Sequence, residues 1–447
     1  LHVPALVYEP VPAPSRPTPV VLNFNGHEGT GLGNSYHQAR CINLAKKGLY
    51  AINVEWIGMT QLATEGQQHY RMNQLDLVGT PGLAVFYESL RPDKDLGDSE
   101  QTPSDLAAAA DYTHLSALMA PRPLLLTHNA QDSCCFRADY AVAPLLQQVA
   151  PVYSLLGVRE RFDYHVNYDA GHNYEQDNRE AFYRFLHTHL LGGRPGFDPR
   201  EVDVTKEIRD VSMLKVPVPA DNADFRSLAR GILATLPAAR PHTRERLGEL
   251  VRYQRLDTRV VPAAAAVGNA AFWKLHMGPW TVPATELSPA TVRGTTLLLA
   301  DEGRAKAGAE AQRLLADGQR VVALDPWYFG ESSLGRIDFL YGLLVAGLGE
   351  RPLGLQAGQV AAAARWLKAR DGAPVRIVAR GPRTGLIARV AAALERDAIA
   401  GVEVQGGWTT LREVLDRNIS AKEMPEMFAF GLLAEFDIPQ IEQLGRR

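Results

Sequence analysis

The sequence has little cysteine, no long apolar segment and no excess of basic charge. Only three of its 447 residues are cysteines: Cys41, Cys134 and Cys135. Adjacent cysteines rarely bond to each other, so we expect no disulfide framework. No C-x-x-C or H-x-x-x-H spacing accompanies them, as a metal site would require. We therefore interpret all three as buried, reduced thiols and predict neither a metal nor a cofactor.

These absences also exclude two kinds of partner. The formal net charge is −3, so the chain has no basic surface for nucleic acid. No apolar run is long enough to span a membrane. No signal peptide is visible, but the chain begins at Leu1 without a methionine. We expect a soluble protein, secreted or periplasmic if a signal precedes Leu1. The oligomeric state is not predicted.

Strand and helix patterns alternate through the first 200 residues. Apolar runs predict strands at 20–25, 49–56, 123–129 and 161–167, and amphipathic spacing predicts helices at 35–47 and 178–191. Such alternation is typical of an α/β fold with a mostly parallel sheet.

The alternation weakens and then restarts. From 201 to 290 the pattern predicts helices only, at 223–236 and 243–255, so we interpret this region as a small helical linker. From 291 to 447, strands are predicted at 295–300, 320–325 and 375–380, and helices at 356–370 and 386–394. The repeated order indicates a tandem duplication, with domains at 1–200 and 291–447.

Three elements of the first domain together fit acyl-transfer chemistry. The loop Gly26-His27-Glu28-Gly29 follows a predicted strand, where backbone N–H groups can face a developing oxyanion; a tight turn is the alternative. Asp132 and His172 follow the strands at 123–129 and 161–167. Acid before histidine is the chain order of α/β hydrolases. The alternatives are an Asx turn or helix cap for Asp132 and a solvated loop position for His172.

The nucleophile of such a site has no visible counterpart. The Gly-x-Ser-x-Gly motif that should precede the acid is absent from the whole sequence. Ser99 follows Gly97-Asp98, as in another esterase class, but it lies in a charged, Pro-bounded loop, so we expect another role for it. In the second domain, Arg383 stands at the nucleophile position of the turn 381–385, and residues 291–447 contain no histidine. We predict a degenerate domain kept for packing; an anion site around Arg380 and Arg383 is the alternative.

Long stretches of the chain resemble a bacterial family of two-domain α/β-hydrolases described as acetyl xylan esterase-like. The similar stretches are NFNGHEGTG (23–31), QARCINLAKKG (38–48), VEWIGM (54–59), HYRMNQLDLVGTPGLAVFY (69–87), DLGDSEQTPSDL (95–106), DYTHLSALMAPRPLLLTHNAQDSCCF (111–136), HVNYDAGHNYEQDNREAFYRF (165–185), GERPLG (349–354) and FGLLAEFDIPQ (430–440). The resemblance implies tandem α/β-hydrolase-type domains. It also implies a carboxylic ester hydrolase that deacetylates xylan or a related carbohydrate ester by a Ser-His-Asp mechanism.

The resemblance also implies roles for individual residues. His172 would be the general base and Asp132 its orienting acid. Gly26, His27, Glu28 and Gly29 would form the oxyanion site and pocket. Trp56, Gln61 and Tyr70 would contact substrate, with a core or pocket-wall role as the alternative for Trp56.

One departure from the family matters most. Members continue after the segment at 69–87 into a helix, a strand and a serine-bearing turn, whereas here Tyr87 is followed at once by a charged stretch. About two βα units, on the order of 30 residues each, are missing. A misassembled gene, an engineered deletion and a natural pseudoenzyme are the possible origins. The last would be a non-catalytic carbohydrate-binding or scaffold protein. A serine peptidase of related fold is disfavoured, because no propeller or gating domain precedes the sheet.

Overall fold

The chain folds as two units, which are described separately. The structure is a computed structural model that describes all residues except 16, 25, 27–28, 64–68, 82–102, 134–136, 170, 237–240, 336–337 and 447. With those gaps, unit 1 contains residues 1–69 and 106–225, and unit 2 contains residues 70–81, 103–105 and 226–446. The second unit thus begins near residue 226 rather than at 291, and it includes a short segment from the first half of the chain.

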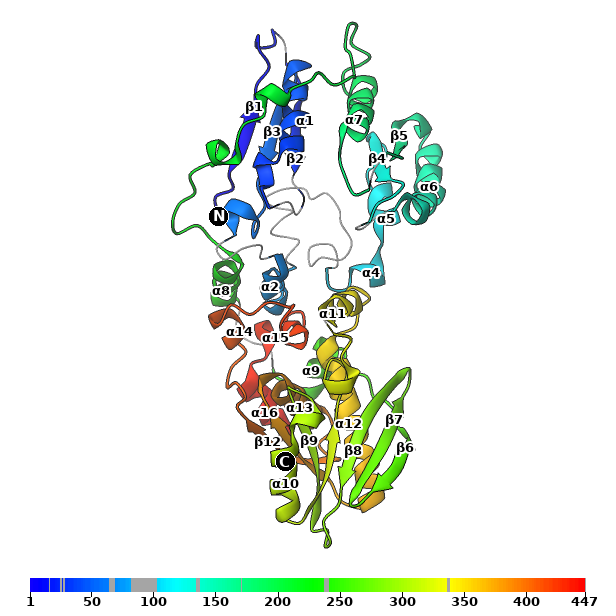
Figure 1. Cartoon of the computed structure of the whole chain (residues 1–447), viewed down its shortest axis with the longest axis vertical. Helices are drawn as coiled ribbons and strands as arrows, with labels where there is room; N and C mark the ends of the chain where they lie inside the picture. Colours follow the sequence, from blue (N-terminus) through cyan, green and yellow to red (C-terminus); the bar gives the residue numbers. More distant parts are fainter. Residues whose placement is uncertain are drawn as a thin grey trace. The chain divides into compact units, whose positions relative to one another are not determined.

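Unit 1 contains two separate small sheets. Its strands are β1 (Ala5–Tyr8), β2 (Val20–Phe24), β3 (Tyr50–Val54), β4 (Leu124–Asn129) and β5 (Phe162–Asn167). In the first sheet, β3 lies between β1, which is antiparallel to it, and β2, which is parallel. The second sheet is the parallel pair β4–β5. Figure 1 shows the two groups of strands. The strands predicted in this unit are confirmed, but the described ones do not form one continuous sheet.

Helices cover one face of the first sheet and connect it to the second. The helices of unit 1 are α1 (Ser35–Lys46), α4 (Leu106–Ala109), α5 (Tyr112–Ala117), α6 (Ala138–Leu155) and α7 (Gln176–His189). Cys41 and Leu44 of α1 pack with Tyr183 and Leu186 of α7 against this sheet, and α7 also contacts β4 and β5. Cys41 is fully buried, as expected, and burial raises the pKa of its thiol to about 11. Cys134 and Cys135 lie outside the described residues.

Unit 2 is organised around one mixed sheet. Its strands are β6 (Arg259–Val267), β7 (Ala270–Met277), β8 (Trp280–Leu287), β9 (Gly294–Ala300), β10 (Gln319–Leu324), β11 (Val375–Arg380) and β12 (Ile399–Gln405). Their order is β12-β11-β9-β10-β8-β7-β6. β9 to β12 are parallel, whereas β6, β7 and β8 add an antiparallel part. The expectation of a mostly parallel sheet is therefore wrong for this unit.

The helical interpretation of residues 201–290 is also wrong, because β6, β7 and β8 lie there. Two features of the sequence hide these strands. β6 contains Pro262 and a run of alanines, and β8 contains Pro283. Alanine and proline are both depleted in strands, although an edge strand such as β6 tolerates proline. The predicted helices at 223–236 and 243–255 do form, in shorter versions.

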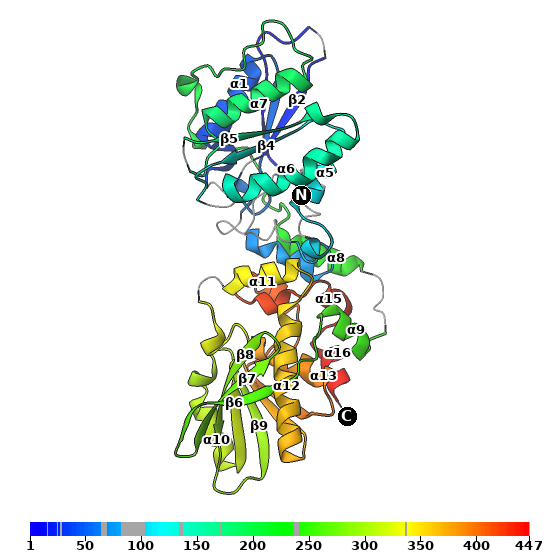
Figure 2. The same cartoon turned by 90° about the vertical axis from the view of Figure 1, so that its right-hand side faces the viewer.

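Helices cover both faces of the parallel part of this sheet. The helices of unit 2 are α2 (Asn73–Leu77), α8 (Phe225–Thr235, which starts at the last residue of unit 1), α9 (Arg244–Leu250), α10 (Gly308–Ala316), α11 (Asp338–Gly347), α12 (Pro352–Asp371), α13 (Pro382–Leu394), α14 (Glu413–Asp416), α15 (Leu432–Glu435) and α16 (Ile438–Gly445). α10 packs against Leu298 and Ala323 on one face. The long helix α12 contacts β7, β9 and β11 (Figure 2). It begins at Pro352 and ends before Gly372, whose φ of 75° suits a glycine cap.

The two units share a local arrangement of strands and turns. In each unit a central strand, β3 or β10, lies between an antiparallel neighbour, β1 or β8, and a parallel neighbour, β2 or β9. The loops after β3 and β10 also match in backbone conformation: φ is 77° at Gly58 and 76° at Tyr328, and 36° at Thr60 and 49° at Gly330. Each loop starts with a buried acid, Glu55 or Asp325.

The units differ in what covers the second face of these strands. Leu22 pairs with Ile52, and Leu297 pairs with Val322, at equivalent places in the two sheets. Leu297 is fully buried, whereas Leu22 is 57% exposed and its neighbour Val20 is 54% exposed. Unit 1 therefore leaves apolar strand residues in contact with solvent on the face that is buried in unit 2.

This difference predicts unequal costs for the same mutation. Leu297→Ala should lower the free energy of unfolding of unit 2 by about 2–5 kcal/mol, because it leaves a cavity in a packed core. Leu22→Ala should change the stability of unit 1 by less than about 0.5 kcal/mol, because the side chain is largely solvated. Chemical denaturation of both variants measures the two costs. Equal losses would mean that another part of the protein covers Leu22 in solution.

Candidate active site

Asp132 and His172 form a hydrogen-bonded pair in unit 1. Nδ1 of His172 lies 3.0 Å from Oδ2 and 3.2 Å from Oδ1 of Asp132. The side chain of Asp132 is 6% exposed and that of His172 is 47% exposed. A buried carboxylate beside Nδ1 favours the tautomer that carries its proton there, and it directs Nε2 away from the acid. The pairing that the sequence predicted is thus present.

The strands explain how residues 40 positions apart meet. β4 and β5 are parallel neighbours, with Asn129 opposite Asn167 at their last positions. Asp132 lies three residues beyond β4 and His172 five residues beyond β5. Because parallel strands end at the same edge of a sheet, both loops emerge side by side.

The loop predicted to hold an oxyanion is only partly described. His27 and Glu28 lie outside the described residues. Gly26 is half-buried and Gly29 is exposed, and a Cβ at Gly29 would meet nothing within 4 Å. The glycine that the fold requires is Gly31, whose φ is +50° and whose Cβ would lie 2.6 Å from Oε2 of Glu55. The sequence analysis missed this contact, although an acid directly after the apolar strand was a visible signal.

The three residues predicted to contact substrate have other surroundings. Trp56 is 5% exposed, which agrees with the core alternative. Oε1 of Gln61 accepts a hydrogen bond from the backbone N–H of Val216 at 2.9 Å. Tyr70 belongs to unit 2, where its carbonyl accepts a hydrogen bond from Ala421. The contact of these three residues with substrate stays a prediction.

In unit 2, the turn that corresponds to a nucleophile turn is already filled. The carboxylate of Asp301 accepts hydrogen bonds from the backbone N–H groups of Thr384 at 2.8 Å and Arg383 at 3.1 Å, and from the Thr384 hydroxyl at 2.7 Å. A Cβ at Gly381, where φ is +108°, would collide with this carboxylate. Backbone donors that would face an oxyanion in a hydrolase are thus occupied by the protein itself.

The side chain of Arg383 is occupied as well. It forms an ion pair with Glu426, which is fully buried, and its guanidinium lies 4.5 Å from the centre of the Phe329 ring. Its charge is therefore balanced inside the unit. This arrangement favours the packing role predicted for the second domain over an anion site at Arg383.

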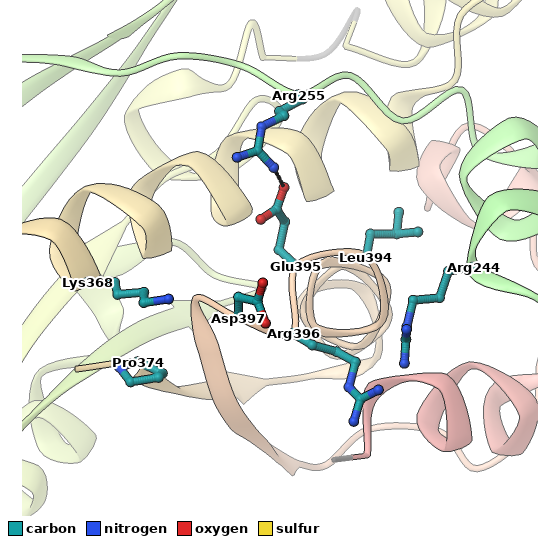
Figure 3. A pocket seen from close by; sticks show the side chains of 8 residues that line it. All are labelled: Arg244, Arg255, Lys368, Pro374, Leu394, Glu395, Arg396 and Asp397. Atoms are coloured by element: carbon teal, nitrogen blue, oxygen red, sulfur yellow. Dashed lines mark hydrogen bonds and ion pairs between the residues drawn. The ribbon is translucent and has the colours of Figure 1, made fainter. Parts of the chain in front are cut away.

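A hollow of about 790 Å³ in unit 2 lies away from this turn (Figure 3). Its lining is Arg244, Arg255, Lys368, Pro374, Leu394, Glu395, Arg396 and Asp397. Positive and negative groups alternate there, and Arg255 and Arg365 both bind Glu395 at 2.6 Å. The hollow precedes the amino end of β12, whereas α/β sheets bind ligands at carboxyl ends.

Two features are absent from the part of the chain that the structure describes. Within it, no three or more His, Cys, Asp or Glu side chains gather as metal ligands would. None of its helices combines the length and the apolar character needed to cross a membrane.

No protein-family model matches the chain, and no curated protein matches it. Several solved esterases are similar in part. An esterase from an Arctic intertidal metagenomic library aligns with a TM-score of 0.26 and 19% identity, over 31% of this chain and 62% of that chain. A methylesterase aligns with a TM-score of 0.36 and 16% identity, over 48% and 57%. Acetyl xylan esterase 1 from a Thermoanaerobacterium species aligns with a TM-score of 0.32 and 15% identity, over 47% and 74%. The chain thus spans less than two thirds of the first two proteins.

The internal carboxylate of Asp301 predicts a pH dependence of stability. Burial raises its pKa above the ordinary value, and its hydrogen bonds to Thr384 and Arg383 only partly oppose this. Between the unfolded and folded pKa values, the folded state holds a proton that the unfolded state releases. Its contribution to stability is therefore full below the unfolded pKa and is lost as pH rises through the folded pKa. The unfolding free energy of wild type minus that of Asp301→Asn should fall with rising pH in urea denaturation.

Asp371 provides a control of opposite sign. Burial alone would raise its pKa, but hydrogen bonds from Arg370 and Thr295 outweigh burial and lower it. The difference between wild type and Asp371→Asn should therefore rise with pH over the acid range. For Asp301→Asn, the difference in unfolding free energy should fall with pH. A difference that stays constant or rises with pH would contradict the raised pKa of Asp301.

Proposed function

We propose that unit 1 is built on the plan of a carboxylic ester hydrolase, with Asp132 and His172 as its acid–histidine pair. The observation that carries the proposal is the 3.0 Å contact between Nδ1 of His172 and a nearly buried carboxylate. It lies beyond the carboxyl ends of two parallel strands, where this class of enzyme places its histidine. A surface His–Asp contact would lack both the buried acid and this position.

The pair would work as a proton relay. In a complete hydrolase, a serine oxygen attacks the acyl carbon while its proton moves to Nε2 of the histidine. The histidine then gives the proton to the departing alcohol and activates water in the second half of the reaction. Asp132 would stabilise the imidazolium, and backbone N–H groups of residues 26–29 would bind the oxyanion. The sequence resemblance favours an acetyl ester of xylan or a related carbohydrate as substrate.

The nucleophile is the part that this chain lacks. We infer that the two units are diverged copies of one fold. In unit 2, β9 pairs with β10 on one side and with β11 on the other, and β11 leads into the turn at 381–385. Among the described residues, β2 of unit 1 pairs only with β3. The absence of a partner equivalent to β11 agrees with the loss of about two βα units from the sequence.

The chain would then hold the acid–base half of a site without its serine. A protein that descends from hydrolases but has no serine-dependent turnover would have both the Asp132–His172 pair and the missing strand. The second candidate function, a non-catalytic carbohydrate-binding or scaffold protein, is favoured by the same missing strand and by the filled turn at Asp301. Binding of acetylated xylan oligosaccharides by calorimetry, without release of acetate, would select that candidate.

Covalent labelling tests whether the chain carries an activated serine. A fluorophosphonate probe should leave no adduct on the native chain, because no serine among the described residues is hydrogen-bonded to His172. Intact-mass spectrometry measures this directly. If an adduct forms, peptide mapping identifies the serine, and an adduct at Ser99 would restore the interpretation that the sequence analysis disfavoured.

Restoring the missing segment tests whether Asp132 and His172 can serve as the acid and base of a complete site. The missing segment, taken from a full-length member of the resembled family, is grafted between Tyr87 and Asp95. The grafted chain should hydrolyse a chromogenic acetate ester, because the graft supplies the serine turn and the strand beside β2. His172→Ala in the grafted chain should lower kcat by about 10⁶-fold, because the serine and the histidine of such a relay act as a unit.

Two controls make the reconstruction decisive. Replacing the grafted serine by alanine should give the same loss as His172→Ala, because residues that act as a unit are not additive. His165→Ala removes a different histidine, one that pairs with Asp177 at 2.6 Å in the same unit, and it should leave most of the rate. A grafted chain that folds and turns over equally well without His172 would refute the proposed role of the pair.

A further inference from the structure

Two buried asparagines end the strands that precede Asp132 and His172. Asn129 is the last residue of β4 and is 6% exposed, and Asn167 is the last residue of β5 and is 1% exposed. They face each other in the ladder. A buried amide is costly unless both its donor and its acceptor are satisfied, so the partners of these side chains are informative.

Asn129 holds the residue that follows His172. Its Nδ2 donates to the carbonyl oxygen of Asn173 at 2.9 Å. Its Oδ1 accepts a hydrogen bond from Nδ2 of Asn178 at 2.9 Å. Asn178 lies in the first turn of α7, is 1% exposed, and contacts the same Asn173 carbonyl at 3.3 Å. Two buried amides therefore converge on one peptide group next to the histidine.

Asn167 acts on the same loop from the neighbouring strand. Its Nδ2 lies 3.3 Å from Oδ1 of Asn173, and its own Oδ1 accepts the backbone N–H of Asp169 at 2.9 Å. Its carbonyl accepts the backbone N–H of Ala130, on the Asp132 side, at 2.8 Å. Asn173 in turn donates to the carbonyl of Gly171 at 2.8 Å. The loop is thus fastened on both sides of His172 and tied to the strand end that leads to Asp132.

We propose that Asn129, Asn167 and Asn178 are positioning residues, which set the loop of His172 so that its Nδ1 meets Asp132. The inference rests on the proposed function, in which the tautomer of this histidine matters. His172 is half-exposed and its ring has little packing around it, so the backbone of its loop must supply the orientation. Neutral amides suit this role, because they fix a backbone without adding charge beside the acid.

The tautomer of His172 reports this role without any substrate. Nitrogen-15 shifts of histidine-labelled protein show which ring nitrogen carries the proton when the imidazole is neutral, and loss of a signal in His172→Gln identifies the residue. In wild type we expect the proton on Nδ1, facing Asp132. In Asn129→Ala and in the nearly isosteric Asn178→Leu, the Nδ1–H share should fall toward that of free histidine. A merely structural role would lower stability and leave the tautomer unchanged.

Asn43 offers a matched control in the same unit. It is fully buried in α1, donates to the carbonyl of Val202 at 3.3 Å and accepts the Val202 N–H at 2.9 Å. Asn43→Ala removes a comparable buried amide far along the chain from the pair. It should lower the melting temperature, as Asn129→Ala does, and keep the wild-type tautomer of His172.

Asn173→Ala keeps the inference testable if the core variants do not fold. It removes the contacts to Asn167 and Gly171 from a half-buried loop position, and we expect the same loss of the Nδ1–H tautomer. A wild-type nitrogen signature in this variant and in every folded core variant would overturn the inference. Failure of the grafted chain to hydrolyse esters, with these signatures intact, would instead count against the proposed function alone.

Discussion

The pairing of β4 with β5 is the interaction on which the candidate site depends. Two parallel strands in register deliver their following loops to the same edge, so a carboxylate and an imidazole 40 residues apart come within 3.0 Å. A shift of one residue would turn every side chain of a strand to the opposite face and move the loops apart. No described strand connects this pair of strands to β2. Helix α6 packs on the pair through Val149 and Tyr153, which contact Phe162 of β5, and α7 contacts both strands.

The two units show what a complete sheet contributes to this fold. In unit 2, β9 has a strand on each side and helices on both faces. Its residues from Thr296 to Leu299 are fully buried. In unit 1 the equivalent β2 pairs only with β3 among the residues that the structure describes, and it exposes Val20 and Leu22. In unit 2, Asp301 fills the turn at 381–385, and no histidine follows residue 291. Unit 1 holds the hydrogen-bonded pair of Asp132 and His172.

The sequence predicted the parallel strands and the acid–histidine pair because these depend on local patterns. Continuous apolar runs such as residues 20–24 and 124–129 mark strands, and loop residues after them mark the candidate site, although β2 exposes Val20 and Leu22. β6, β7 and β8 were missed because Pro262, Pro283 and an alanine run do not carry a strand pattern. Their place in the sheet comes from pairing with distant residues such as those of β10, which no local window contains.

The roles of single residues were harder to predict than the pair itself. Gln61 and Tyr70 stand in stretches that resemble a hydrolase family, yet Gln61 bonds the backbone N–H of Val216, and the Tyr70 ring lies 5.9 Å from Nζ of Lys422. The asparagines at the ends of β4 and β5 gave no signal, because an asparagine after a strand usually reads as a turn. Their contacts follow from burial: the enclosed amides of Asn129 and Asn167 need hydrogen-bond partners, and both donate to Asn173 in the loop that carries His172. The neutral amides of Asn129 and Asn167 thus hold the loop that carries His172 without placing a charge beside the carboxylate of Asp132.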